Sequence, residues 1–226
     1  LVLFALVTLV WFALRMPETL APENRAPFSL QRIIGATREI MRTRPAVGYT
    51  LTAGLVSGSF IGYLNSAQQI FQDQYALGER FPLYFALVSL SLGVASFLNA
   101  RLVMRFGMRF LARWSLLIVF GLSSVVLGII LLSAGQPPLW GFMAYLMTAF
   151  FLVGILFGNL NSLAMEPLGH IAGIGAALVG SLSTLIAMLL GTIIGRSYNG
   201  TILPLIAGIA ILAGLSILVM RWAEAT

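Results

Sequence analysis

The sequence contains few charged residues and lacks cysteine and lysine altogether. Only 9% of its 226 residues are charged, whereas a soluble domain usually carries about 25%. Seven acids and thirteen bases, all of them Arg, are too few to cover a water-exposed surface. The composition therefore excludes a soluble enzyme domain, a disordered chain and a nucleic-acid-binding module. Without cysteine, disulfides, thiolate metal sites and a cysteine nucleophile are excluded as well.

Long uncharged runs make up most of the chain, of which 59% is hydrophobic. About 20 apolar residues cross the hydrocarbon core of a bilayer as a helix. The longest run is divided by Gly135-Gln136-Pro137-Pro138, because consecutive prolines cannot continue a helix. We expect an all-α integral membrane protein, a helical bundle of six full spans near 46–71, 82–103, 112–133, 139–163, 171–194 and 201–220.

The segment before these spans differs from them. Residues 1–14 are apolar but would rise only about 21 Å as a helix, too little to cross. We interpret them as one truncated span, the remnant of the last span of a missing N-terminal half. Residues 15–45 are predicted to be a linker with an amphipathic helix, and 46–222 a six-span C-terminal transporter domain. A long linker between such units is typical of transporters built from two similar halves.

The arginines are distributed unevenly along the chain. If the spans alternate in direction, eleven of the thirteen Arg residues fall on one side of the membrane. Cytoplasmic loops carry an excess of positive charge. The linker and the C-terminus are therefore predicted to be cytoplasmic, in a multi-pass membrane protein.

The first full span has two distinct faces at helical spacing. A row of small residues predicts close helix packing, with a flexible hinge as the alternative: Gly54, Gly58 and Gly62. Polar side chains follow another arc of this span and one side of the fourth span. They either line a substrate cavity or bond neighbouring helices and their own backbone. These residues are Thr52, Ser59, Tyr63, Ser66, Tyr145, Thr148 and Asn159. The scattered Phe and Met residues are expected in the core or facing lipid.

Ionisable side chains are absent from the middle of every full span. Asp73, Glu79 and Glu166 all lie at span ends. Intramembrane carboxylates usually mark proton pathways. If transport is coupled to protons, the coupling acid is expected outside this sequence. One histidine cannot form a metal site, and nothing predicts a cofactor.

The turn between the second and third spans carries Asn99 and Arg101, followed by Arg105-x-Gly107-x-Arg109. Glycine permits a positive φ in a tight turn, and the arginines suit phosphates or helix C-termini. We expect gate or turn residues on the cytoplasmic side, namely Arg101, Arg105, Arg109 and, from the next cytoplasmic turn, Glu166. The alternative is that these charges only set the topology.

A second turn reads Glu166-Pro167-Leu-Gly169-His170. Proline and glycine favour an abrupt reversal of the chain. Glu166 is the one acid within reach of the Arg-rich turn, so an ion pair between spans is our working hypothesis, with a solvated carboxylate as the alternative. His170 is expected to be a hydrogen-bonded structural residue, although it could titrate near neutral pH.

At these turns the sequence resembles the major facilitator superfamily, and within it the Bcr/CflA-type multidrug efflux transporters. The resemblance covers the second half of that family. Met104 stands where the family's loop motif normally has an acid. The matching segments are Arg15-Met-Pro17-Glu18-Thr19-Leu20, Asn99-x-Arg101-Leu102 running into Arg105-Phe106-Gly107-x-Arg109, and Ala164-Met-Glu166-Pro167-Leu-Gly169-His170-Ile-Ala-Gly173.

The resemblance implies a secondary active transporter, not an enzyme, that exports amphipathic drugs or related small molecules by alternating access, coupled to protons. Its implied partners are the lipid bilayer, a small-molecule substrate, protons and the missing N-terminal half, and no nucleic acid. The chain alone is then expected to be inactive. The alternative function is a non-transporting membrane scaffold or a half-transporter that dimerises through its glycine face.

Overall fold

The computed structural model describes residues 2–17, 29–133 and 136–225. The chain divides into two units, Leu1–Ile34 and Gly35–Thr226. The first contains helix α1, Val2–Arg15, which buries none of its side chains. Glu18, Thr19 and Leu20 of the first family-like segment lie outside the described residues.

Helix α2, Leu30–Arg42, continues from the first unit into the second. It lies in the segment where the sequence predicts an amphipathic helix. In the second unit its Ala36 and Ile40 are buried, while Arg38 and Glu39 are exposed. One side of this part of α2 therefore packs on protein and the other carries charge.

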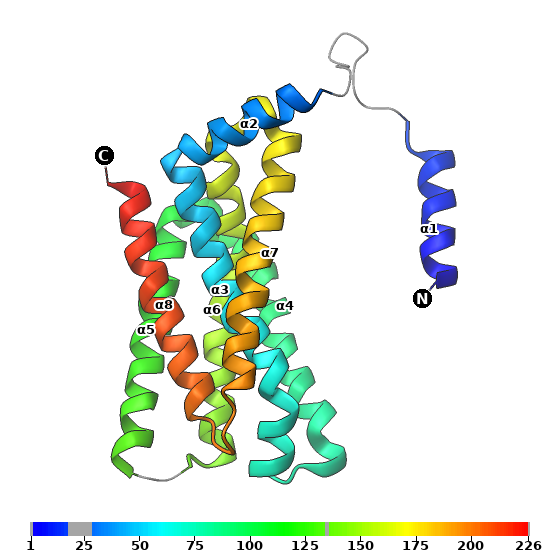
Figure 1. Cartoon of the computed structure of the whole chain (residues 1–226). Helices are drawn as coiled ribbons and strands as arrows, with labels where there is room; N and C mark the ends of the chain where they lie inside the picture. The colour runs from blue at the N-terminus through cyan, green and yellow to red at the C-terminus, as the bar shows by residue number, and fades with distance from the viewer. Residues whose placement is uncertain (1, 18–28, 134–135, 226) are drawn as a thin grey trace. The chain divides into compact units, whose positions relative to one another are not determined.

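Six long helices build the second unit (Figure 1). Five segments are long and apolar enough to span a membrane, and one of them, Leu139–Arg196, contains two of the helices. The predicted all-α membrane bundle is confirmed. The helices are α3 (Arg44–Gln69, continued by the π-helix η2, Ile70–Gln74), α4 (Phe81–Phe106), α5 (Met108–Ser133), α6 (Leu139–Met165), α7 (Ala172–Arg196) and α8 (Leu203–Glu224).

The turn between α4 and α5 is shorter than the sequence suggests. Gly107 alone separates the two helices, with φ +80°, and its nitrogen bonds the Val103 carbonyl oxygen at 2.9 Å. Helix α5 thus begins at Met108, four residues before the predicted span. Arg109 and Arg113 therefore belong to the first turns of α5. The predicted span starts after Arg109 because charged residues lower the hydropathy, but a helix end at the membrane surface tolerates charge.

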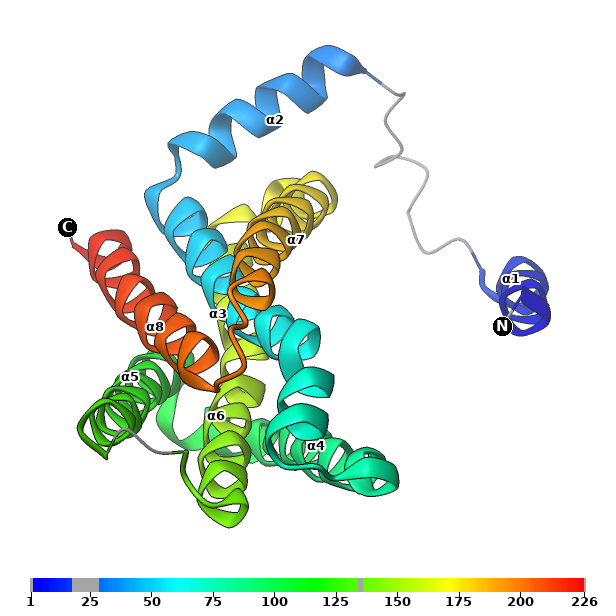
Figure 2. The same ribbon diagram turned by 60° about the horizontal axis from the view of Figure 1, so that its bottom comes forward.

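Helices α3 and α6 lie at the centre of the bundle (Figure 2). Helix α3 packs against α7, α8 and α6, and α6 packs in addition against α4 and α5. Helices α5 and α8 pack against each other on the outside. Helix α7 packs mainly on α3 and α4 mainly on α6, so these two are the least enclosed of the six.

The predicted glycine row of α3 packs against α7. A Cβ on Gly54 would lie 2.9 Å from the Ile186 Cβ, and one on Gly62 would lie 2.9 Å from the Ile194 Cβ. Gly58 has more room, since its nearest neighbour would be the Leu190 Cβ at 3.2 Å. Such close approach is how membrane helices gain van der Waals contact when no water drives them together.

Glycines of α7 complete the same contact, and they provide a matched test. A Cβ on Gly191 would lie 2.5 Å from the Ile61 Cβ and 2.9 Å from the Gly62 nitrogen, whereas one on Gly180 would meet nothing within 4 Å. We expect Gly191→Ala to destabilise the bundle by about 1–3 kcal/mol through overpacking. Gly180→Ala should change its stability by less than about 0.5 kcal/mol. Thermal unfolding of the purified variants in detergent measures both, and equal Tm values would contradict this packing.

Candidate functional site

The hydroxyl arc of α3 lies inside the bundle. Thr52, Ser59 and Ser66 are at most 4% exposed. Thr52 Oγ1 donates to the Gly48 carbonyl oxygen and Ser66 Oγ to the Gly62 carbonyl oxygen, each at 2.8 Å. The structure thus shows backbone bonding for two members of the arc. A substrate-lining role for the arc stays a prediction, which this burial does not favour.

Tyr63 belongs to a cluster of aromatic rings between α3, α4 and α6. Its ring stacks on Phe85 at 5.9 Å and contacts Phe150 at 4.7 Å between centroids. The side chain is 1% exposed, and its hydroxyl has no hydrogen-bond partner among the described residues. Leaving a buried hydroxyl unpaired costs free energy, so Tyr63 carries an unsatisfied group in the core.

The polar residues predicted on α6 have three different environments. Tyr145 Oη and Ser123 Oγ of α5 share a hydrogen bond of 2.9 Å in the core. Thr148 is exposed and donates to the carbonyl oxygen of Ala144 at 2.8 Å. Asn159 Nδ2 donates to Asn99 Oδ1 of α4 at 2.8 Å and to the backbone of its own helix. These residues therefore do not gather in one cavity of the described structure.

The Asn99–Asn159 contact depends on a close approach of α4 and α6. A Cβ on Gly154 would lie 2.8 Å from the Ala95 Cβ and 2.9 Å from the Leu92 carbonyl oxygen. Two small residues thus bring the helices together one turn away from the amides. The sequence places Asn99 in a turn and Asn159 in a span, and no periodicity within either segment could have paired residues 60 positions apart.

A groove between α3, α6 and α7 was not predicted. It has a volume of about 230 Å³. Phe60 and Phe157 meet edge to face in it, with 5.9 Å between ring centroids, and Phe60 also contacts the deeper Phe150. Sequence reasoning missed the groove because it assigned Phe and Met to the core or to lipid. Its lining residues are Ser57, Phe60, Ile61, Phe157, Ser183, Thr184, Ala187 and Met188.

The two turns that the sequence singles out meet at one end of the bundle, which we call the Arg-rich end. Arg109 Nη2 lies 2.9 Å from Glu166 Oε2, with 64% and 50% of the two side chains exposed. The ion pair of our working hypothesis is thus present between α5 and the short 3₁₀-helix η4, Glu166–Ile171, that joins α6 to α7. Its role as a gate stays a prediction.

The other residues of these turns differ in their contacts. His170 Nε2 lies 2.6 Å from Glu39 Oε1 and so links η4 to α2. Leu168 is fully buried and anchors η4, while Pro167 and Gly169 are exposed. Arg101 lies over the ring of Phe97 and Arg105 over that of Phe106. No group of three or more metal-binding side chains occurs among the described residues.

Two of the buried tyrosines, Tyr63 and Tyr145, give a test of the unpaired hydroxyl. Tyr63→Phe removes an unsatisfied group and should leave the free energy of unfolding unchanged or raise it by about 1–3 kcal/mol. Tyr145→Phe removes the hydrogen bond to Ser123 and should lower it by about 1 kcal/mol. Denaturant unfolding in detergent micelles measures both variants. A loss of stability in Tyr63→Phe as large as in Tyr145→Phe would show that Tyr63 already has a partner.

Comparison with known proteins gives two relatives. The chain is 29% identical over 197 residues to an uncharacterized MFS-type transporter, YdgK, of Bacillus subtilis, covering 85% of this chain and 47% of that protein. It is 25% identical over 202 residues to a bicyclomycin resistance protein homolog of Haemophilus influenzae, covering 88% and 49%. The chain therefore spans about half the length of these relatives.

No family model matches the chain, and no solved structure gives a significant match. The two relatives and the long apolar helices of the structure agree, because both indicate a multi-pass helical membrane protein. The printed name of the first relative assigns it to the major facilitator superfamily, abbreviated MFS. The comparisons therefore support a transporter of the major facilitator superfamily as the class that this chain resembles, without distinguishing one branch of it.

Proposed function

We propose that the chain is the C-terminal half of a secondary active transporter of the Bcr/CflA type, which exports amphipathic drugs or related small molecules in exchange for protons. The similarity to two transporters over 85% and 88% of the chain carries this proposal. Residues 1–14 would be the end of the last span of an N-terminal half, and 15–45 the cytoplasmic linker. The Arg-rich end would face the cytoplasm of a bacterium.

The groove between α3, α6 and α7 is proposed as this half's share of the substrate site. Aromatic rings, a thioether and hydroxyls suit a molecule that is largely apolar with a few polar groups. Its 230 Å³ is smaller than the roughly 300–1,000 Å³ of a typical ligand site. A second half that covers the groove would enlarge and close the site, and rocking of the two halves would expose it to each side in turn.

Proton coupling is assigned to the N-terminal half. The spans of this chain carry acids only at their ends, and a proton pathway needs a titratable group at membrane depth. The acids of the described residues that form ion pairs lie at the Arg-rich end instead. Glu39 and Glu166 are half exposed there.

The Arg109–Glu166 pair is proposed to act as part of a cytoplasmic gate, together with Asn99, Arg101 and the Gly107 turn. Exposed ion pairs contribute only about 0–1 kcal/mol, so such a contact can break and form again in every transport cycle. The pair joins the start of α5 to η4, and η4 leads directly into α7 beside the groove. A change at the gate can therefore reach the groove through one helix.

The scaffold alternative loses its main support in this structure. It requires the glycine face of α3 to bind a second copy. That face is already covered by α7. A Cβ added at Gly54 would touch Ile186, and one added at Gly62 would touch Ile194.

Transport of a fluorescent amphipathic cation into everted membrane vesicles tests the proposal. We compare the chain alone with a tandem protein in which the N-terminal half of the Haemophilus influenzae relative precedes it. Energised vesicles should show transport with the tandem protein, none with the chain alone, and none after the proton gradient is dissipated. Transport by the chain alone would contradict the half-transporter assignment, and gradient-independent transport would contradict proton coupling.

Two neighbouring residues of α7 test the groove. Met188 lines it and Leu189 does not, although their exposed fractions are 58% and 59%. In the tandem protein, Met188→Ala should raise the KM for the cation by about three- to tenfold, since an apolar contact in a binding pocket is lost. Leu189→Ala should leave KM within about twofold of the parent. Equal effects of the two changes would mean that the groove does not bind this substrate.

A further inference from the structure

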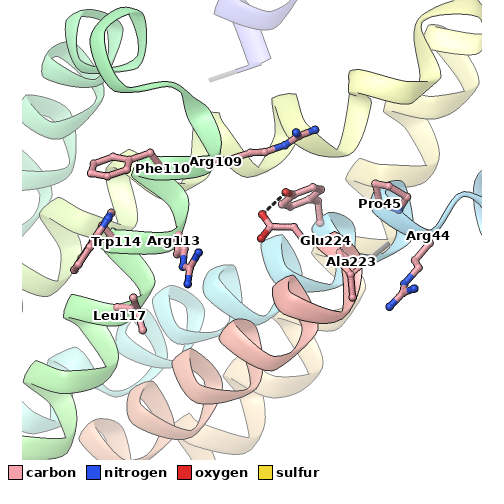
Figure 3. Close-up of a pocket in the computed structure, with 11 residues that line it drawn as sticks. Arg44, Pro45, Arg109, Phe110, Arg113, Trp114, Leu117, Ala223 and Glu224 are labelled. Atoms are coloured by element: carbon pink, nitrogen blue, oxygen red, sulfur yellow. Dashed lines mark hydrogen bonds between the residues drawn. The ribbon is translucent and has the colours of Figure 1, made fainter.

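A second and larger pocket opens at the Arg-rich end and shares no lining residue with the groove. Its volume is about 1,010 Å³. It lies where α3 and α5 begin and α8 ends, and Figure 3 shows the labelled residues around it. A stripe along α5 forms one wall, and the first turns of α3 with the last residues of α8 form the rest. The charged and polar lining residues are Arg44, Tyr49, Arg109, Arg113 and Glu224.

The pocket has an excess of positive charge. Three guanidinium groups and one carboxylate give it a formal net charge of +2. The carboxylate is occupied, because Glu224 Oε1 accepts a hydrogen bond of 2.7 Å from Tyr49 Oη, marked by the dashed line in Figure 3. Arg109 is paired with Glu166. With Arg109 paired, the charge that faces a ligand is that of Arg44 and Arg113 against Glu224, which stays negative because its partner is a neutral phenol. The pocket therefore keeps a net positive charge of +1.

These two arginines have no carboxylate partner among the described residues. Arg113 is exposed and projects from the α5 wall. Arg44 lies over the Trp222 ring at 5.0 Å, and its Nε is buried without a hydrogen-bond partner in the described chain. Arg44 therefore adds positive charge to the pocket wall, although its buried Nε is not accessible to a ligand there.

The backbone adds to the attraction for an anion. Arg44 is the first residue of α3, and its N-cap Thr43 makes no side-chain capping bond. Met108 is the first residue of α5, directly beside the pocket. Two helix N-termini therefore contribute partial positive charge to this region, and the C-terminus of α8 contributes partial negative charge. The sum of the three helix ends is positive.

The same α5 wall carries apolar and aromatic side chains between and below the arginines. Phe110 and Trp114 are about half exposed, and their rings lie 6.0 Å apart. Leu117 continues the wall one turn further into the bundle. Exposed tryptophan beside arginine is typical of the level at which lipid headgroups meet hydrocarbon. A ligand here meets positive charge at one end and an apolar wall at the other.

We propose that this pocket binds an anionic glycerophospholipid. The lipid phosphate lies at Arg113, within the positive field of Arg44, and an acyl chain follows Trp114 and Leu117. Basic pockets between membrane helices are suited to such headgroups. The site is separate from the groove, so the proposal does not depend on the transported substrate.

Native mass spectrometry of the purified full chain tests this assignment. The chain is titrated in detergent with phosphatidylglycerol and with phosphatidylcholine of the same acyl chains. Each arginine near a headgroup contributes about fivefold to the affinity for an anionic lipid. We therefore expect phosphatidylglycerol to bind at least about fivefold more tightly than phosphatidylcholine, and Arg113→Gln to remove about fivefold of this preference.

Arg221→Gln is the matched control, because Arg221 is exposed near the end of α8 but does not line the pocket. It should leave the preference within about twofold of the parent. Arg113 is exposed, so its replacement leaves the core intact, and gel filtration verifies this. Arg44→Gln combined with Arg113→Gln should abolish the preference.

Three results would overturn the proposal. One is equal affinity of the parent for the two lipids. Another is the same loss in Arg221→Gln as in Arg113→Gln, which would indicate general surface charge. The third is displacement of phosphatidylglycerol by excess inorganic phosphate, which would assign the pocket to a free anion.

Discussion

Two apolar helices in a bilayer associate only where their surfaces fit each other more closely than lipid chains fit them. Helix α3 meets this condition along its whole length against α7, through Gly54 and Gly62 on one side and Gly191 on the other. Because α3 also contacts α6 and α8, its position fixes the centre of the bundle. The groove is a consequence of this packing, since Phe60 and Ile61 reach it from the α3 surface beside the contact.

Much of the fold could be predicted from the sequence, because span length and proline position depend on local composition. The boundary at Met108 could not, since Arg109 and Arg113 look like the edge of a span until Gly107 is seen to make the turn alone. The glycine row was predicted to pack closely because its spacing is regular. Which helices cover the polar arc of α3 could not be predicted, since periodicity describes one helix and burial depends on its neighbours.

In the candidate site, too, some contacts could be predicted from the sequence and others depend on how distant helices pack. Glu166 could be linked to the Arg-rich turn because few acids were available, and the structure places it against Arg109. Asn99 and Asn159 form their contact only because Gly154 and Ala95 bring two distant segments together. The groove depends on three helices at once, and its phenylalanines are the same residue type that fills the core. The sequence pattern alone does not distinguish a phenylalanine that lines the groove from one that fills the core.

The hydroxyl groups of the long helices have a mechanical consequence. Thr52, Ser66 and Thr148 each donate to a carbonyl oxygen one turn back in their own helix, so these polar groups are satisfied without a neighbour. A helix that shifts or rotates against the next one then exchanges dispersion contacts but breaks none of these hydrogen bonds. Such hydrogen bonds do not oppose sliding, whereas a bond between two helices, such as Asn99–Asn159, would have to break for α4 and α6 to move apart.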